Sequence, residues 1–174
     1  MRVFGFAGLS NAGKTTLIEA LIDRWVAQGL QLAVIKHAHQ GFDIDRPGKD
    51  SWRHREAGAS QVLISSGQRW VLMHECRDEP EPRLHTLIGQ LSPCDLVLVE
   101  GYKRSRLPKL EVHREQTGHP WMFPDDEAIV GVACDSPPPA TASRPEVFGL
   151  TDYDAIAAFV LKQALPVELL PSDS

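Results

Sequence analysis

The stretch that decides the fold is Gly8-Leu9-Ser10-Asn11-Ala12-Gly13-Lys14-Thr15, near the start of the chain. It fits the pattern G-x-x-x-x-G-K-[ST] of phosphate-binding loops. The residues before it, 2–7, are mostly apolar and predict a buried strand. The residues after it, 14–28, repeat apolar side chains at helical spacing and end before Gly29. The sequence therefore predicts a strand, a phosphate-binding loop and a helix in succession.

Each position of this loop has a physical role in holding the phosphates of a nucleotide. Gly8 and Gly13 let the backbone turn tightly and point N–H groups at phosphate oxygens. The helix beginning at Lys14 directs its positive end at the same anion, and the Lys14 ammonium adds a point charge. Thr15 can offer its hydroxyl to Mg²⁺. The predicted nucleotide-binding residues of the loop are Gly8, Ser10, Asn11, Ala12, Gly13, Lys14, Thr15 and Thr16. The alternative is a glycine-rich turn that only joins a strand to a helix.

The rest of the chain predicts an α/β fold like that of the P-loop NTPases, with a mainly parallel sheet flanked by helices and some antiparallel strand pairs. A second strand is expected at residues 32–35, so that the chain begins as a parallel unit. Further strands are predicted at residues 61–65, 69–73, 95–99, 110–113 and 129–133, and helices at 51–57, 84–91 and 152–165. With 174 residues, we expect one nucleotide-binding domain over 1–174, with a frayed tail at 166–174.

The composition is that of a globular protein. Apolar residues make up 43% of the chain and charged residues 24%, with a net charge of −5. A protein that binds nucleic acid through phosphate contacts is usually basic, so that class is disfavoured. No apolar run approaches the roughly 18 residues of a membrane helix, and the N-terminal residues lead into a glycine loop and not a cleavage site. The three widely spaced cysteines, without a CxxC pair, favour a cytoplasmic protein.

Glu100 is the acidic residue best placed to serve the phosphate-binding loop. Phosphoryl chemistry requires a carboxylate near the magnesium ion, and ligands of open parallel sheets lie at the carboxyl ends of strands. Asp95 lies at the opposite end of the strand predicted at residues 95–99, about 16 Å from Glu100. Gly101 would let the backbone approach the γ-phosphate. The alternative is that Glu100 is an ordinary solvated strand end.

A polar stretch at residues 37–50 follows the second strand, and long loops of this kind are usually functional or disordered. Asp50 could contact the magnesium ion, directly or through water, or position the attacking water, and Lys36 or Lys49 could neutralise phosphate charge. His37 and His39 could bind a transition metal, but two histidines without cysteine are weak support for a site. Solvated loop residues are the simpler account of both histidines.

The chain does not contain the Asn-Lys-x-Asp motif with which many GTP-binding proteins read guanine, since Asn11 is its only asparagine. Asp135 follows the strand predicted at residues 129–133, at a carboxyl end. Its carboxylate could accept both the N1–H and the N2–H₂ donors of guanine. A turn aspartate before the prolines that follow is an equal alternative.

Together these residues resemble the MobB family, the adaptor proteins of molybdopterin-guanine dinucleotide biosynthesis, over nearly the whole chain. The family pattern places Lys-His-x-His after the second strand, matched here by Lys36-His37-Ala38-His39. The segments 43–51 and 55–59 match its Asp-x-Asp-x-Pro-Gly-Lys-Asp-Ser and Arg-x-Ala-Gly-Ala patterns, and Gln68-Arg69-Trp70 and 98–103 match as well. The Pro-Gly-Lys-Asp-Ser run and the Glu-Gly strand end are the more specific parts, since many families share the phosphate-binding loop.

The resemblance implies a homodimer that binds GTP with Mg²⁺ and hydrolyses it weakly. Such a protein assists the molybdenum cofactor guanylyltransferase, a MobA-like enzyme that joins GMP to molybdopterin, and molybdopterin itself is a further candidate ligand. Lys14, Glu100 and Asp50 would then be the catalytic residues, with Thr15, Glu100 and Asp50 holding the metal. This chain has Gln40 where the family often has a further histidine, which weakens a metal site at the histidines and leaves the nucleotide site unaffected.

Hydrolysis should be slow, because no glutamine is placed by a motif to orient water and no arginine finger can be assigned in cis. Arg53, Arg55 and Arg104 are candidates for an arginine finger in trans. Two other functions remain open. A small-molecule kinase of the same fold would use residues 103–106 as a lid, and a GTP-driven metallochaperone would require Cys or His ligands, such as Cys76, near the nucleotide.

Overall fold

The computed structural model describes residues 1–38, 41–103, 105–140 and 145–170. It divides the chain into two compact units, one formed by Met1–His37 and Arg83–Ser174 and the other by Ala38–Pro82. The sequence predicts a single nucleotide-binding domain over residues 1–174, and this stays a prediction. None of the helices in the described part of the chain is long and apolar enough to cross a membrane.

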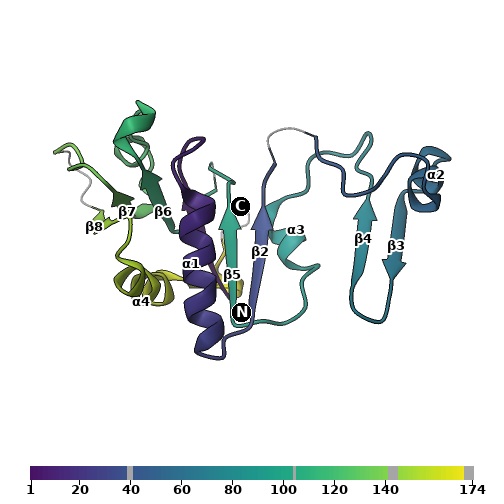
Figure 1. Ribbon diagram of the computed structural model, residues 1–174, viewed down its shortest axis with the longest axis horizontal. Helices are drawn as coiled ribbons and strands as arrows, with labels where there is room; N and C mark the ends of the chain where they lie inside the picture. Colours follow the sequence, from purple (N-terminus) through teal and green to yellow (C-terminus); the bar gives the residue numbers. More distant parts are fainter. Residues whose placement is uncertain (39–40, 104, 141–144, 171–174) are drawn as a thin grey trace. The chain divides into compact units, whose positions relative to one another are not determined.

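The first unit is built on a mainly parallel sheet (Figure 1). Its strands are β1 (Arg2–Ala7), β2 (Leu32–Lys36), β5 (Leu96–Glu100), β6 (Lys109–His113), β7 (Ile129–Cys134), β8 (Glu146–Gly149) and β9 (Leu165–Pro166). The order is β2-β5-β1-β6-β7-β8, with every neighbouring pair parallel, and β9 pairs antiparallel with the start of β1. The α/β fold class predicted from the sequence is confirmed, with β1 in the centre of the sheet.

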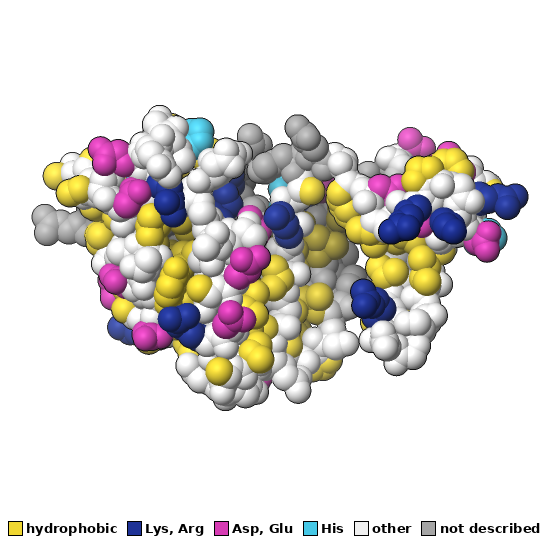
Figure 2. Space-filling model, in the orientation of Figure 1, with side chains coloured by type: hydrophobic (Ala, Val, Ile, Leu, Met, Phe, Trp, Pro, Cys, Tyr) yellow, Lys and Arg dark blue, Asp and Glu magenta, His cyan; other side chains and the backbone are white. Residues whose placement is uncertain are grey.

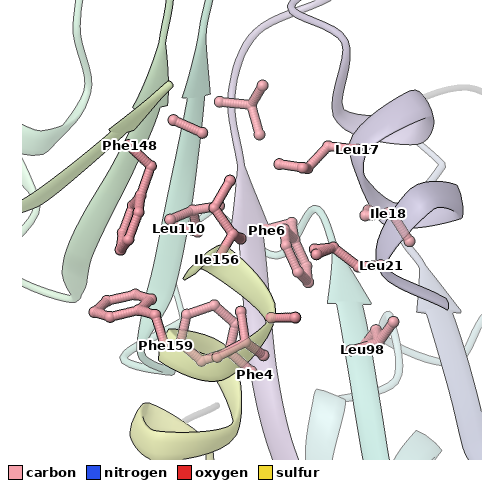
Figure 3. Close-up of a cluster of buried hydrophobic side chains, with 14 of the residues drawn as sticks. Phe4, Phe6, Leu17, Ile18, Leu21, Leu98, Leu110, Phe148, Ile156 and Phe159 are labelled. Atoms are coloured by element: carbon pink, nitrogen blue, oxygen red, sulfur yellow. The ribbon is translucent and has the colours of Figure 1, made fainter. Parts of the chain in front are cut away.

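Helices cover both faces of this sheet. The helices α1 (Lys14–Ala27) and α4 (Tyr153–Gln163) pack on one face, and the short α3 (Leu84–Ile88) packs on the other. Figure 3 shows the first of these two cores, in which leucine and isoleucine side chains of α1 and α4 surround aromatic rings of the strands. The rings of Phe4 and Phe159 meet edge to face with their centroids 6.2 Å apart.

The period of two along each strand explains why two separate cores form. In β1, Phe4 and Phe6 point to the face covered by α1 and α4, while Val3 points to the face covered by α3. In β5 the even-numbered leucines and the odd-numbered valines divide in the same way, and Leu96–Val99 are all at most 1% exposed. A strand that is buried on both faces has a continuous apolar sequence, and this pattern predicts β5.

The second unit contains α2 (Asp50–Glu56) and the antiparallel hairpin of β3 (Gln61–Ser65) and β4 (Trp70–His74). The Arg55 guanidinium holds its loops together. It donates to Glu75 at 2.8 Å and to Asp43 at 3.0 Å, and it lies 3.5 Å from Asp45. The backbone N–H of Asp45 and the Arg55 side chain lower the pKa of Asp43. These ion pairs tie the segments before and after the hairpin to α2.

The C-terminal segment is more ordered than the sequence predicts. A frayed tail was expected from residue 166, but Leu165 and Pro166 pair with β1, and a 3₁₀ turn follows at Val167–Leu169. Val167 and Leu170 pack against the core on the α3 face. The sequence also gives no strong pattern for β8 and β9, which are only four and two residues long. Residues 171–174 of the expected tail lie outside the described part of the chain.

We expect Phe4→Ala to lower the free energy of unfolding by about 3–5 kcal/mol, because it removes a fully buried ring and leaves a cavity between β1 and α4. Urea unfolding followed by circular dichroism measures this loss. Phe42→Ala is the matched control, since Phe42 is 77% exposed and its removal should change stability by less than about 0.5 kcal/mol. Equal effects of the two substitutions would contradict this account of the core.

Candidate functional site

The phosphate-binding loop connects β1 to α1 at the carboxyl end of the sheet. Gly8 has a φ of 141°, and a Cβ there would lie 2.5 Å from the carbonyl oxygen of Val112 in β6. Gly13 has a φ of 94°, which also favours glycine. Asn11 adopts a φ of 63°, a conformation that asparagine tolerates better than most residues. The loop therefore has the tight backbone that its sequence pattern predicts.

The N-terminus of α1 has no side-chain cap among the described residues. Its N-cap residue is Gly13, which makes no side-chain cap hydrogen bond, and the first turn contains no acidic residue. The first N–H groups of a helix lack intrahelical acceptors, and the helix dipole adds positive potential at this end. Thr15 and Thr16 lie exposed in the same turn. The arrangement is suited to an anion with several oxygen acceptors.

The Lys14 ammonium folds back over the loop. It donates to the carbonyl oxygens of Gly8 and Leu9, at 3.0 Å each. Burial lowers the pKa of Lys14, while the charge of Glu100 opposes this shift and those of Lys103 and Lys36 add to it. Three cations and one carboxylate therefore act on one another at this end of the sheet.

Glu100 lies where the sequence predicts, at the end of the strand next to β1. It is in register with Phe6 of β1 on one side and with Lys36 of β2 on the other. The Lys36 ammonium is 3.6 Å from the carboxylate, whose side chain is only 13% exposed. Gly101 follows with a φ of 99°, and a Cβ there would come within 2.7 Å of the His37 Cβ. This glycine allows β2 and β5 to end close together.

Asp95 lies at the other end of β5, as expected. Its carboxylate accepts the backbone N–H of Gln31 at 2.7 Å, and its carbonyl oxygen accepts that of Arg2 at 3.0 Å. These contacts join the loop before β2 to the starts of β1 and β5. Asp95 therefore stabilises the fold at the end of the sheet away from the phosphate-binding loop. Glu100 is the carboxylate of β5 at the end of the sheet where the loop lies.

Three buried polar residues alternate along β6 and face away from α1. Lys109 is 1% exposed and donates to Asp126 at 2.6 Å and to the carbonyl oxygens of Lys103 and Ser105. Glu111 is 1% exposed and accepts two backbone N–H groups, those of residues 122 and 123, at 2.9 Å each. Burial raises the pKa of the Glu111 carboxyl. These bonds hold the segments after β5 and β6 in place.

The third of these residues, His113, lies at the end of β6. Its ring stacks on Trp121, with centroids 3.7 Å apart and an interplanar angle of 13°. Burial lowers the pKa of His113, the charges of Asp135 and Glu115 oppose this shift, and that of His119 adds to it. The stacked pair fixes the segment that follows β6 beside the phosphate-binding loop.

This segment contacts the loop directly. The His119 ring nitrogen Nε2 lies 3.2 Å from the carbonyl oxygen of Ser10. Arg114, the first residue after β6, brings its guanidinium to within 3.3 Å of the place that a Gly13 Cβ would occupy. Asp135, at the end of β7, accepts the backbone N–H of Glu115 at 2.8 Å. The ends of β6 and β7 therefore line the side of the loop opposite Glu100.

The other predicted residues belong to the second unit or lie outside the described residues. Asp50 is exposed in the first turn of α2, and Lys49 is its N-cap residue, both in the second unit. A role for Asp50 as a magnesium ligand or catalytic residue stays a prediction. His39, Gln40 and Arg104 lie outside the described residues. Within the described ranges, no group of three or more His, Cys, Asp and Glu side chains is arranged to hold a metal ion.

Sequence reasoning missed Lys109, Glu111 and Arg114. The signal for the first two was present, because charged residues alternate with Leu110 and Val112 in the run Lys-Leu-Glu-Val-His. In a parallel strand with both faces covered, such charges require buried partners. No comparable signal marked Arg114, since only the register of β6 with β1 brings it to the loop.

Comparison with known proteins identifies the family. The model of the family "Molybdopterin guanine dinucleotide synthesis protein B" matches residues 3–135. The chain is 38% identical over 163 residues to the molybdopterin-guanine dinucleotide biosynthesis adapter protein of Escherichia coli, covering 92% of this chain and 91% of that protein. It belongs to the MobB family. The adapter protein of Haemophilus influenzae is 42% identical over 139 residues, which cover 78% of this chain and 75% of that one.

Solved MobB structures have the same fold. The MobB homologue of Bacillus stearothermophilus superposes with a TM-score of 0.67 at 25% identity, covering 92% of this chain and 95% of that one. Bacillus subtilis MobB, at 24% identity, gives a TM-score of 0.70 over 94% and 98% of the two chains and supports the fold alone. The resemblance found in the sequence is confirmed at the level of family and fold.

Protonation of His113 should destabilise the protein. Burial holds the pKa of His113 in the folded protein below that of an unfolded histidine, which is about 6.5. Between these two pKa values the unfolded chain is protonated at His113 and the folded chain is not. The loss of unfolding free energy that His113 causes is absent above pH 6.5 and grows as the pH falls towards the pKa of His113 in the folded protein. Wild-type protein should therefore lose more unfolding free energy between pH 7.5 and 5.5 than His113→Phe, which keeps an aromatic ring against Trp121.

Urea unfolding at the two pH values measures this difference. His85→Phe is the matched control, because His85 lies exposed on α3 and its substitution should leave the pH dependence as in the wild type. An identical pH dependence in wild-type protein and His113→Phe would show that the environment of His113 does not disfavour its charged form.

Proposed function

We propose that this chain is an adapter protein in molybdopterin-guanine dinucleotide biosynthesis, and that it acts by binding GTP with Mg²⁺. Membership of the MobB family supports the pathway. The single observation that carries the nucleotide proposal is the uncapped N-terminus of α1 behind a loop of two positive-φ glycines, with Lys14 over it. This geometry leaves N–H donors and positive charge directed at one anion.

The residues at the loop fit a magnesium ion. Magnesium prefers oxygen ligands and is usually bound by one or two carboxylate or hydroxyl groups together with substrate phosphates. Thr15 supplies the hydroxyl in the first turn of α1, and Glu100 supplies the carboxylate at the end of β5. When bound, the ion would neutralise charge on the β- and γ-phosphates. Asp50 of the second unit remains a proposed third contributor.

Asp135 is the proposed reader of the base. It lies at the end of β7, two strands from β1 and on the opposite side from Glu100. The N–H of Glu115 already holds its Oδ1 atom at 2.8 Å, which orients the carboxylate. A carboxylate with both oxygens available for further hydrogen bonds matches the N1–H and N2–H₂ donors of guanine. Adenine lacks this pair of donors, so Asp135 would favour GTP over ATP.

Hydrolysis of the bound GTP is proposed to be weak, and the chain acts mainly as an accessory protein. Lys14 and Glu100 would supply the phosphate and metal contacts, but no described glutamine at the loop is placed to orient water. We propose that the protein's partners are the molybdenum cofactor guanylyltransferase, a MobA-like enzyme, and molybdopterin. The place of action is proposed to be the cytoplasm.

The hairpin of the second unit supports a homodimer. Apolar side chains lie on both of its faces, and Leu63 and Trp70 are 59% and 62% exposed. Figure 2 shows apolar side chains at the surface of this hairpin. Leu63 lies directly opposite Leu72 across the two strands, and Ile64 lies opposite Val71 on the other face. A two-stranded sheet is marginally stable in water by itself, so its apolar side chains favour a further strand or sheet against them. We propose that the hairpin of a second copy supplies it.

We expect purified wild-type protein to bind GTP with Mg²⁺ at least tenfold more tightly than ATP, a difference of about 1.4 kcal/mol, in calorimetric titrations. Lys14→Ala should abolish binding of both nucleotides, because it removes the charge at the phosphates. Lys162→Ala, at the last turn of α4, is the matched control and should bind as the wild type does.

The outcomes separate the proposed functions. A wild-type preference for GTP that Asp135→Asn removes would support the guanine reading. Equal binding of the two nucleotides, or a preference for ATP, would contradict it and favour a small-molecule kinase, which would transfer phosphate to an added acceptor. Unchanged affinity in Lys14→Ala would contradict the assignment of the phosphate-binding loop.

Leu63→Lys should convert the proposed dimer into a monomer, because it places a charge in the apolar surface of β3. Sedimentation velocity at several protein concentrations measures the change. Val26→Lys is the control, since Val26 is 56% exposed on α1, and it should remain dimeric. A wild-type monomer at all concentrations, or a dimer that survives Leu63→Lys, would contradict the hairpin interface.

A further inference from the structure

Arg114 is the first residue after β6, and its side chain reaches the phosphate-binding loop from the side opposite Glu100. Its Nη2, Nε and Cζ atoms lie 3.3, 3.8 and 4.0 Å from the place that a Cβ of Gly13 would occupy. Gly13 is also the N-cap residue of α1. The guanidinium is therefore packed against the point where the loop becomes the helix.

No hydrogen bond or ion pair of the Arg114 side chain is found within the described residues, although a guanidinium carries five N–H donors. The other arginines that are partly buried have acceptors. Arg55 binds three carboxylates, and Arg24 binds Asp154 at 2.7 Å. Placing an unpaired cation next to the positive end of a helix is unfavourable unless an anion joins them. The surroundings of Arg114 therefore lack the negative partner that they require.

The position of Arg114 relative to Glu100 indicates which part of the anion it meets. Glu100, Lys36 and Lys103 lie at the ends of β5 and β2 or just beyond them, on one side of β1. Arg114 and Asp135 lie at the ends of β6 and β7, on the other side. With the metal and the γ-phosphate on the Glu100 side and the base on the Asp135 side, the phosphates between them lie next to Arg114.

We propose that Arg114 binds the α- and β-phosphates of the nucleotide and is a residue of the binding site in cis. This inference rests on the proposed function, since it requires a nucleotide at the loop. Arginine suits such a position because its planar fork can donate two parallel hydrogen bonds to phosphate oxygens. Its contribution is to the affinity for the phosphates that GTP and GDP share.

The test is a calorimetric comparison of Arg114→Gln with wild-type protein, using GTP and GDP, each with Mg²⁺. Both dissociation constants should rise roughly tenfold or more, and by the same factor, because the contacts are to phosphates that the two nucleotides share. Arg114→Lys should recover part of the loss, since it restores the charge without the fork.

Arg24→Gln is the matched control, because it removes the same charge from the last turn of α1, at the far end of the helix. It should bind both nucleotides as the wild type does. Thermal unfolding of each variant without nucleotide establishes that it is folded, and Arg114→Lys provides the measurement if Arg114→Gln is not.

Four results would overturn the inference. Unchanged affinity in Arg114→Gln would show that no phosphate contact exists. Weaker binding of GTP alone would place the guanidinium at the γ-phosphate, and a lower turnover rate with unchanged affinity would make it an arginine finger. Failure of wild-type protein to bind any nucleotide would overturn the proposed function itself, whereas normal wild-type binding with a normal Arg114→Gln overturns this inference alone.

Discussion

The parallel pairing of β1 with β5 and β6 is the constraint on which the candidate site depends. Because the phosphate-binding loop follows β1 without an intervening residue, whatever ends the two neighbouring strands lies beside the loop. Register places Glu100 opposite Phe6, and the carbonyl oxygen of Val112 lies so close to Gly8 that no side chain fits there. A shift of one residue in either pair would reverse the faces of the shifted strand and remove the contact that this pair makes.

The buried polar face of β6 has a second consequence for this site. Desolvating Lys109 and Glu111 is unfavourable unless each is paired, and every partner lies in the segments that follow β5 and β6. The apolar face of the same strand packs against α1 and α4. One strand thus uses hydrophobic burial to hold its helices and charged hydrogen bonds to hold its loops. Those loops carry Lys103 on one side and Arg114 on the other.

Most of the sheet could be predicted from the sequence, because its strongest elements have local patterns. The glycine loop, the amphipathic run of α1 and the apolar run of β5 each specify their own structure. The short strands β8 and β9 could not be predicted. They have only four and two residues, and they are stabilised by pairing with β7 and β1 and not by a local sequence pattern. The second unit could not be predicted either, because Arg55 holds it together through hydrogen bonds with residues up to 20 positions away, which no local pattern reveals.

The same distinction applies to the site. Glu100 could be predicted because it ends an apolar strand, and strand ends meet at one edge of a parallel sheet. Arg114 could not, because the order of β6 beside β1 is a property of the assembled sheet. The phosphate-binding loop binds phosphate mainly through its backbone, and the backbone conformation of the loop restricts which residue types can occupy it. For this reason a sequence pattern identifies these residues. A side chain that reaches the same anion from another strand can be replaced by a different residue on a different strand, so its position follows from topology and not from a motif. This explains why the two halves of the site were not equally visible in the sequence.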